Sequence, residues 1–380
     1  MVYRDFKGIR LSELGFGAMR LPVIGGNDGN IDRELTCRMV DLAIAKGINY
    51  FDTAWGYHQG NSEIVIGEAL KKYPRDSFYV STKFPGYDLS NMPKVKEIFE
   101  KQLEKTGFDY FDFYLFHNVC EMNIEQYLDP KYGICDYLME QKKNGRIKHL
   151  GFSCHGEMDV LKRFLDAYGK DMEFCQIQLN YLDWKFQDAK AKVELLNERN
   201  IPVWVMEPLR GGRLAKLAGT QESRLKGLRP DEEIPAWAFR FLQSVKGVTM
   251  ILSGMSTPEQ LEKNLKTFEE EKPLNEKEMD ELMNIADELQ AGKSIPCTAC
   301  HYCVSHCPQG LDIPRIISMY NEHLLTVKGG QMAFIAPMAL AAMPDDKKPS
   351  ACLHCRSCEQ VCPQQIKISE MMTDFVEKIG

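Results

Sequence analysis

Two cysteine runs with the same spacing constrain this chain more than any other feature of its sequence. Eight of the 13 cysteines in 380 residues fall in these runs, which cover 297–308 and 352–363. Both runs follow the pattern C-x2-C-x2-C-x3-C-P, with which thiolates hold cubane 4Fe–4S clusters. The sequence therefore predicts two such clusters in a small C-terminal domain. The expected iron ligands are Cys297, Cys300, Cys303, Cys307, Cys352, Cys355, Cys358 and Cys362.

The two runs resemble those of two-cluster ferredoxins, which implies a small, mainly helical ferredoxin-like domain. In such domains the fourth cysteine of each run binds the cluster of the other run. On this assignment Cys362 joins the three leading cysteines of the first run, and Cys307 joins those of the second. The stretch 308–351 between the runs should begin with a helix at 315–323 and carry an apolar segment at 332–343.

Two other uses of the cysteines fit less well. Disulfides would need an oxidising compartment, and the charged start MVYRDFKGIR lacks the apolar core of a secretory signal, so we expect a cytoplasmic protein. Structural zinc usually pairs one C-x2-C with a second pair a dozen or more residues away. Here four thiols fall within 11 residues, twice.

Composition narrows the class of partner. The chain is 44% hydrophobic and 27% charged, which is ordinary for a globular protein with a substantial core. Its net charge of −7 and the lack of a basic stripe argue against nucleic acid. The longest apolar run, 332–343, contains a proline and is too short to span a bilayer, so no membrane is expected either.

The first 270 residues alternate short apolar runs with longer amphipathic ones. The runs read as strands at 14–18, 50–53, 78–83, 111–117, 149–154, 174–179, 202–207 and 248–252. Helical patterns lie at 34–46, 62–72, 93–106, 134–143, 157–168, 187–199, 235–244 and 258–269. Strands that are apolar throughout are buried on both faces, as parallel strands are. Eight such units over this length predict a (β/α)8 TIM barrel, an α/β fold.

A doubly wound sheet is the structural rival. It would need a G-x-G-x-x-G turn between the first strand and a helix, but Leu14-Gly15-Phe16-Gly17-Ala18-Met19 runs on into Arg-Leu-Pro. We therefore expect a barrel domain at 1–273 with a hairpin at 3–10 closing its bottom. A linking helix should follow within 274–293, and the cluster domain should cover 294–380.

Four polar side chains follow or end successive predicted strands, where the chemistry of such barrels collects. They are Asp52, Tyr57, Lys83 and His117. A tyrosine with a pKa near ~10 is a weak acid at neutral pH, and an adjacent ammonium would lower the cost of releasing its proton. Asp52 would be the counter-charge of Lys83, and His117 could orient a carbonyl oxygen. The set suits carbonyl reduction.

In this order and context the four residues resemble the tetrad of the aldo-keto reductases, over about residues 8–270. The shared motifs are GAMRLP at 17–22, FDTAWGY at 51–57, STK at 81–83, LFH at 115–117, GFS at 151–153 and STPEQLEKN at 256–264. The resemblance implies a nicotinamide cofactor, NAD(H) or NADP(H), and a small carbonyl or alcohol substrate. Trp55, His58, Tyr87, Asn118 and Tyr181 would line the mouth.

The resemblance also implies a set of cofactor contacts. They are Gly17, Met19, Ser153, Gln176, Met206, Glu207, Leu209, Gly211, Ser253, Gly254, Ser256, Gln260 and Asn264. This chain departs from the family where Cys154 replaces the asparagine that usually follows the serine, and where Met206 replaces a stacking aromatic ring. Gly254 and Gln260 stand where NADPH-preferring relatives carry cations, although Arg240 or Lys263 could reach this turn.

The two predicted domains pose a problem of electron number. A nicotinamide moves two electrons at once, whereas each cluster carries one. A flavin in the same mouth could mediate, although the chain has no flavin fingerprint. The rival hypothesis is an electron-transfer or redox-sensing protein with a scaffold barrel, which would act with a redox partner protein. A third hypothesis makes the clusters structural staples.

Overall fold

The chain forms two compact units, Met1–Met283 and Asn284–Gly380. The computed structural model describes residues 1–290, 295, 297, 303–327, 333, 335–362 and 364–379. The division falls within α12 (Glu276–Gln290), which lies in the segment 274–293 where a linking helix is predicted. In the part of the chain so described, no helix is long and apolar enough to cross a membrane.

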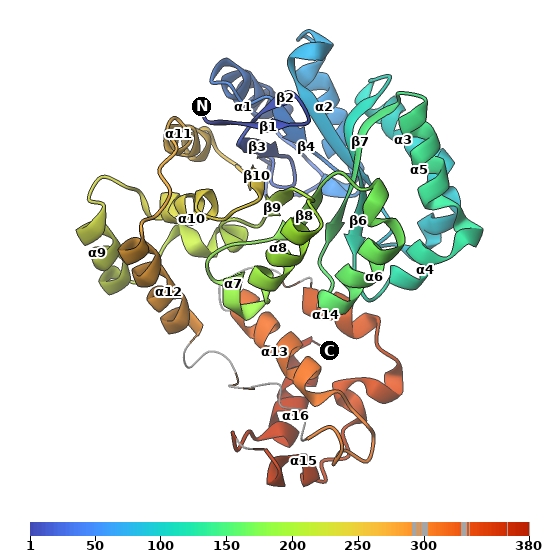
Figure 1. The fold of residues 1–380 in the computed structure, drawn as a ribbon, viewed down its shortest axis with the longest axis vertical. Coiled ribbons are helices and arrows are strands. Elements are labelled where there is room, and N and C mark those ends of the chain that lie inside the picture. The colour runs from blue at the N-terminus through green and yellow to red at the C-terminus, as the bar shows by residue number, and fades with distance from the viewer. Residues whose placement is uncertain are drawn as a thin grey trace. The chain divides into compact units, whose positions relative to one another are not determined.

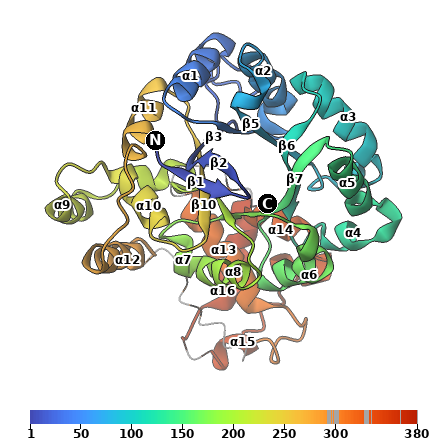
Figure 2. The ribbon, with the colours of Figure 1, turned by 45° about the horizontal axis from the view of Figure 1, so that its top comes forward.

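The first unit is a closed barrel of eight parallel strands, in the order β10-β3-β4-β5-β6-β7-β8-β9 (Figures 1 and 2). The predicted (β/α)8 fold is confirmed, and each predicted strand has its counterpart. The strands are β3 (Leu14–Gly17), β4 (Tyr50–Asp52), β5 (Tyr79–Phe84), β6 (Phe111–Val119), β7 (Ile147–Cys154), β8 (Cys175–Gln178), β9 (Val203–Met206) and β10 (Val248–Gly254).

Helices surround the barrel, and the eight predicted ones are present. They are α1 (Arg33–Ala45), α2 (Ser62–Leu70), α3 (Val95–Thr106), α5 (Ile134–Lys143), α6 (Met158–Tyr168), α8 (Ala189–Glu198), α10 (Ile234–Gln243) and α11 (Pro258–Thr267). Side-chain caps set two of their starts: Asp32 accepts the Leu35 N–H at 2.9 Å, and Thr257 accepts the Gln260 N–H at 3.2 Å.

Three helices of the first unit were not predicted: α4 (Ile124–Leu128), α7 (Asp183–Phe186) and α9 (Gly219–Leu228). The first two are too short to show a helical period. In α9 only Gln221 and Leu225 are buried, so the sequence GTQESRLKGL carries almost no apolar stripe.

A hairpin closes the N-terminal end of the barrel, as predicted. It consists of β1 (Tyr3–Phe6) and β2 (Ile9–Ser12), paired antiparallel. Phe6 projects from it into an aromatic core, with ring centroids 4.9 Å from Trp204 and 5.7 Å from Phe113. This end is therefore filled, and only the opposite end can hold a site.

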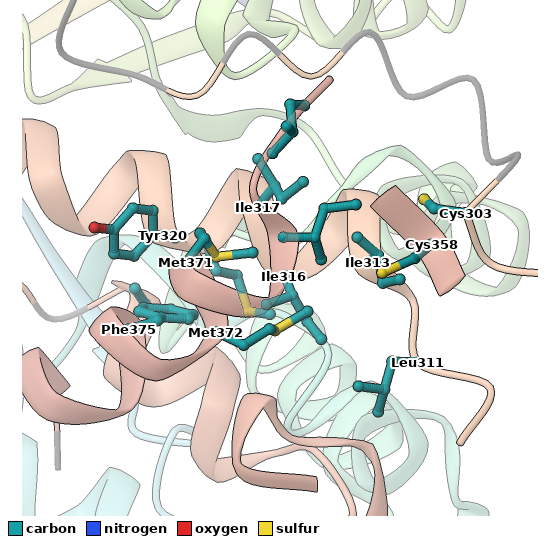
Figure 3. Packing of buried hydrophobic residues seen from close by; sticks show 14 residues of the cluster. Cys303, Leu311, Ile313, Ile316, Ile317, Tyr320, Cys358, Met371, Met372 and Phe375 are labelled. Atoms are coloured by element: carbon teal, nitrogen blue, oxygen red, sulfur yellow. The ribbon is translucent and has the colours of Figure 1, made fainter. Parts of the chain in front are cut away.

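The second unit is helical: α13 (Ile313–Val327), α14 (Ile335–Ala341), α15 (Ser357–Gln360) and α16 (Ile368–Ile379). Helix α13 extends beyond the predicted 315–323 at both ends. At its N-terminus it includes Pro314 as the second residue, where the missing N–H costs no helical hydrogen bond. Ile316 and Ile317 of α13 pack with Met372 and Phe375 of α16 in a core that includes Cys303 and Cys358 (Figure 3).

Close packing of α2 against α3 gives a stability prediction. A Cβ on Gly67 would lie 2.1 Å from the backbone oxygen of Thr106, whereas one on Gly227 in α9 would meet nothing within 4 Å. Gly67→Ala should lower the free energy of unfolding by about 1–3 kcal/mol or more. Gly227→Ala, the control, should raise it by roughly 0.5 kcal/mol. Urea unfolding followed by tryptophan fluorescence measures both, and equal effects would contradict the packing described.

Candidate functional site

The four residues of the predicted tetrad meet at the C-terminal end of the barrel. Asp52 is the last residue of β4, Lys83 lies in β5 and His117 in β6. Tyr57 begins a short 3-10 turn, Tyr57–Gly60, just after β4. The Lys83 Nζ lies 5.0 Å from the centre of the Tyr57 ring, and the rings of Tyr57 and His117 meet edge to face at 5.9 Å.

Lys83 and Asp52 form a buried ion pair. Their side chains are 0% and 4% exposed. The ammonium donates to both Asp52 oxygens, at 2.9 and 2.8 Å, and to the Thr53 carbonyl at 2.7 Å. All three ammonium donors therefore have an acceptor, which a buried charge requires if it is to remain ionised.

Burial sets the protonation of the other two residues. It raises the pKa of Tyr57 well above its usual value, and the charges of Asp52 and Glu207 add to the rise. Burial also lowers the pKa of His117 well below its usual value, helped by the charge of Lys83. At neutral pH the phenol is therefore protonated and the imidazole neutral.

The pKa of Tyr57 is raised, whereas the sequence analysis expected Lys83 to make release of its proton easier. The reason is burial in the first place, and then the negative charges of Asp52 and Glu207, all of which disfavour the phenolate. In this state the ion pair does not make Tyr57 a stronger acid.

One group of the predicted cofactor contacts crosses neighbouring strand ends. Ser153 of β7 lies opposite Gln176 of β8 in the sheet register, and both are buried. The Ser153 hydroxyl accepts the backbone N–H of Asn118 at 2.8 Å. The Gln176 amide nitrogen lies 3.6 Å from the Met206 sulfur, which brings β9 into the group.

A second group lies where β3 meets β10. Gly17 and Gly254 are opposite each other, and a Cβ on Gly17 would lie 3.2 Å from the Ser253 backbone. Asn264 donates to the Ser253 hydroxyl at 3.1 Å. The Gln260 side chain accepts the Ser256 N–H at 2.8 Å. These contacts hold the turn after β10 close to the end of β3.

The remaining predicted contacts are Met19, Glu207, Leu209 and Gly211. Met19 follows β3 and is 45% exposed. The other three follow β9, where Glu207 and Gly211 adopt positive φ angles of 57° and 63°. A Glu207 oxygen lies 3.8 Å from the Arg20 guanidinium, so this turn faces the loop after β3.

Four cysteines of the second unit line one cavity. It is lined by Cys352, Cys355 and Cys358 of the second run and by Cys307 of the first, the set predicted for one cluster. Hydrogen bonds from the Ser357 amide and hydroxyl lower the pKa of the Cys355 thiol, which favours the thiolate that binds iron. The donor set and its convergence fit a cluster.

The predicted ligands of the other cluster lie in or near the core of the same unit. Cys297, Cys303 and Cys362 all contribute to the core of the unit or pack against it. Cys300 lies outside the described residues.

Two family models match the chain. The aldo/keto reductase family matches residues 13–287, and a 4Fe-4S dicluster domain matches residues 296–366. The chain belongs to the aldo-keto reductase family. It is an oxidoreductase of that family that carries a 4Fe–4S dicluster domain after its barrel.

Individual aldo-keto reductases are similar at moderate identity. The NADH-specific methylglyoxal reductase of Escherichia coli (strain K12) is 27% identical over 303 residues, which cover 68% of this chain and 90% of that protein. Aldo-keto reductase AKR11C1 from Bacillus halodurans (holo form) superposes with a TM-score of 0.62 at 24% identity, covering 75% of this chain and 96% of the other. An aldo-keto reductase from Klebsiella pneumoniae in complex with NADPH superposes with a TM-score of 0.59 at 16% identity, covering 75% of this chain and 96% of the other.

The two cations that the sequence analysis suggested for the phosphate turn of this aldo-keto reductase barrel are paired with other residues. Arg240 is buried and bound to Glu232 at 3.1 Å and to the Glu270 carbonyl at 2.7 Å. Lys263 pairs with Glu259 along α11 at 3.0 Å. Arg20, which the sequence analysis did not single out, packs against Gly254. The methylene chain of Arg20 therefore lies beside the end of β10, while its guanidinium lies 3.8 Å from a Glu207 oxygen.

The buried ion pair gives a prediction. Asp52→Asn should cost about 3–5 kcal/mol of unfolding free energy, because it leaves the Lys83 ammonium buried without a counter-charge. Adding Lys83→Met should recover most of the loss, since the uncompensated charge is then gone. Urea unfolding of both single variants and of the double variant measures the coupling. Additive losses would mean that the two side chains do not act as a pair.

Proposed function

We propose that the barrel interconverts a small carbonyl compound and its alcohol with NAD(H) or NADP(H), and that Tyr57 is the general acid and base. The observation that carries this proposal is the convergence of the Tyr57 phenol and the His117 imidazole on one buried ion pair. Few other reactions use such a set, because it offers a proton donor and a hydrogen-bond donor side by side but no strong nucleophile.

The roles of the four side chains follow from their charge states. A bound nicotinamide supplies the hydride for the carbonyl carbon. The Tyr57 hydroxyl gives its proton to the oxygen as negative charge develops there, and the Lys83 ammonium stabilises the phenolate that remains. His117, as a neutral imidazole, orients the carbonyl oxygen through an N–H. In the oxidative direction Tyr57 takes the proton back.

The strand ends suit a nicotinamide. The side-chain oxygen of Gln176, Oε1, is buried and has no hydrogen-bond partner among the described residues, as a carboxamide-binding group would be before its ligand arrives. The remaining contacts proposed are those implied by the family resemblance. The name of the Escherichia coli relative favours NADH. We further propose that the guanidinium of Arg20, whose methylene chain packs on Gly254, binds a phosphate of either cofactor. We do not propose a flavin.

For the second unit we propose that the eight cysteines hold two 4Fe–4S clusters with exchanged fourth ligands. The observation that supports this is the cavity that Cys307 shares with the second run. The clusters would pass single electrons to or from a redox partner protein. Thiolates that bind iron must stay reduced, which suits the cytoplasm. We retain 1–273, 274–293 and 294–380 as the limits of barrel, linking helix and cluster domain.

Removal of one hydroxyl tests the acid. Tyr57→Phe should reduce the rate of carbonyl reduction by about 10²–10⁴-fold, the usual contribution of a general acid. Cofactor affinity should change little, because the ring and its contact with His117 are retained. Stopped-flow single turnovers measure the chemical step and fluorescence titration the affinity. More than half of the wild-type rate would rule out Tyr57 as the acid.

Exchange of the fourth ligands can be tested in the intact chain. Cys307→Ser should damage the cluster of the second run, and Cys362→Ser the cluster of the first, because each run completes the site of the other. Iron and sulfide content with Mössbauer or EPR spectra of the two variants would show which cluster is altered. If each variant damages only the cluster of its own run, the exchange is wrong.

A further inference from the structure

Three polar side chains form a row across the ends of β6, β7 and β8. Asn118 donates its backbone N–H to the Ser153 hydroxyl at 2.8 Å, and Ser153 lies opposite Gln176 in the register of β7 and β8. All three residues are at least nine-tenths buried. The row therefore places an amide-bearing residue on the strand at each side of Ser153.

Two acceptors of this row are unused. The carbonyl oxygens of the Asn118 and Gln176 side chains, Oδ1 and Oε1, are buried and have no hydrogen-bond partner within the described parts of the chain. A buried acceptor without a partner costs free energy, so two in one row of residues need an explanation. A ligand with two donors would satisfy both.

The conformation of Asn118 is held in place by its surroundings. Its φ angle is 57°, in the left-handed region that asparagine tolerates better than most residues. The fully buried Asn123 fixes this turn: its amide nitrogen donates to the carbonyls of Asn118 at 2.8 Å and of Gly86 at 3.1 Å. The Asn123 carbonyl oxygen accepts the Cys120 N–H at 3.0 Å. The orientation of Asn118 is thus built into the fold.

We propose that Asn118 binds the nicotinamide carboxamide together with Gln176 and Ser153. The carboxamide has two N–H donors, which match the two unused oxygens, and one carbonyl, which can accept the hydrogen of the Ser153 hydroxyl. The oxygen of that hydroxyl already accepts the Asn118 N–H, so its hydrogen remains for the ligand. Asn118 would then supply the amide that family members carry after the serine, where this chain has Cys154.

The inference rests on the proposed nicotinamide function, and it makes Asn118 a binding residue of that cofactor. Three contacts to one carboxamide fix the rotation of the ring and hence the face that it turns toward Tyr57 and His117. Replacement of the carboxamide NH2 by a methyl group, as in the 3-acetylpyridine analogue of the dinucleotide, would leave both oxygens without a donor.

The test compares binding of the dinucleotide and its 3-acetylpyridine analogue by isothermal titration. The full chain, with its clusters loaded, is used as wild type, Asn118→Gly and Asn118→Asp. Glycine removes the Oδ1 and keeps the positive φ without strain, whereas aspartate keeps an acceptor in place. ADP-ribose, which has no nicotinamide, serves as a ligand control for the rest of the cofactor pocket.

Wild type should prefer the natural dinucleotide over the analogue. In Asn118→Gly this preference should shrink about three- to tenfold, the effect of one neutral hydrogen bond, while in Asn118→Asp it should be at least as large as in wild type. If Asn118→Gly fails to bind ADP-ribose, Asn118→Ala removes the same oxygen and is judged by the same ratio.

Two failures can be told apart. An undiminished preference in Asn118→Gly, with ADP-ribose still bound, would overturn the role of Asn118 and leave the proposed function intact. Failure of the wild-type protein to bind either dinucleotide would overturn the proposed function, and the inference with it.

Discussion

The buried pair of Lys83 and Asp52 is the interaction on which the barrel site depends. An ammonium with no exposed surface persists only because Asp52 and the Thr53 carbonyl accept all of its donors. The strand that carries it is also fixed from behind, since Gln102 of α3 donates to the Lys83 carbonyl at 3.0 Å and to buried Glu63 at 2.7 Å. The pair thus links β4 and β5 and sets the position of a charge beside Tyr57.

Burial and the charges of this pair together explain the charge state of the site. Burial and the charge of Asp52 raise the pKa of Tyr57, and burial and the charge of Lys83 lower the pKa of His117, so the resting site holds a protonated phenol and a neutral imidazole. Proton release by Tyr57 then becomes favourable only when negative charge develops on a substrate oxygen. This is the behaviour required of an acid that acts during hydride transfer rather than before it.

Much of this could be predicted from the sequence. Continuous apolar strands, helical periods and polar residues at strand ends gave the barrel and brought Asp52, Tyr57, Lys83 and His117 together. The spacing of the cysteine runs gave the second unit. Each of these signals lies within a short stretch of sequence and follows from a simple physical rule. Helices such as α9 escaped because their buried stripe is too thin to leave a period.

The rest depends on distances that no local pattern encodes. The loss of the asparagine after Ser153 is visible in the sequence, but the unused oxygen of Asn118 appears only when β6 and β7 are paired. Likewise Arg20 and Gly254 are more than 200 residues apart in the chain and meet through the pairing of β3 with β10. The pKa of Tyr57 follows from burial and from the nearby charges of Asp52 and Glu207, which the order of residues does not show.

The most direct test of this account is the pKa of Tyr57 itself. Tyrosine labelled with 13C at Cζ gives one NMR signal per residue, and the Tyr57→Phe variant identifies the signal of Tyr57. The account predicts that this signal titrates well above the value of about 10 found for an unperturbed tyrosine in water. A titration below that value would contradict it, because Lys83 would then act as an uncompensated charge and Tyr57 as a partly ionised phenolate in the resting site.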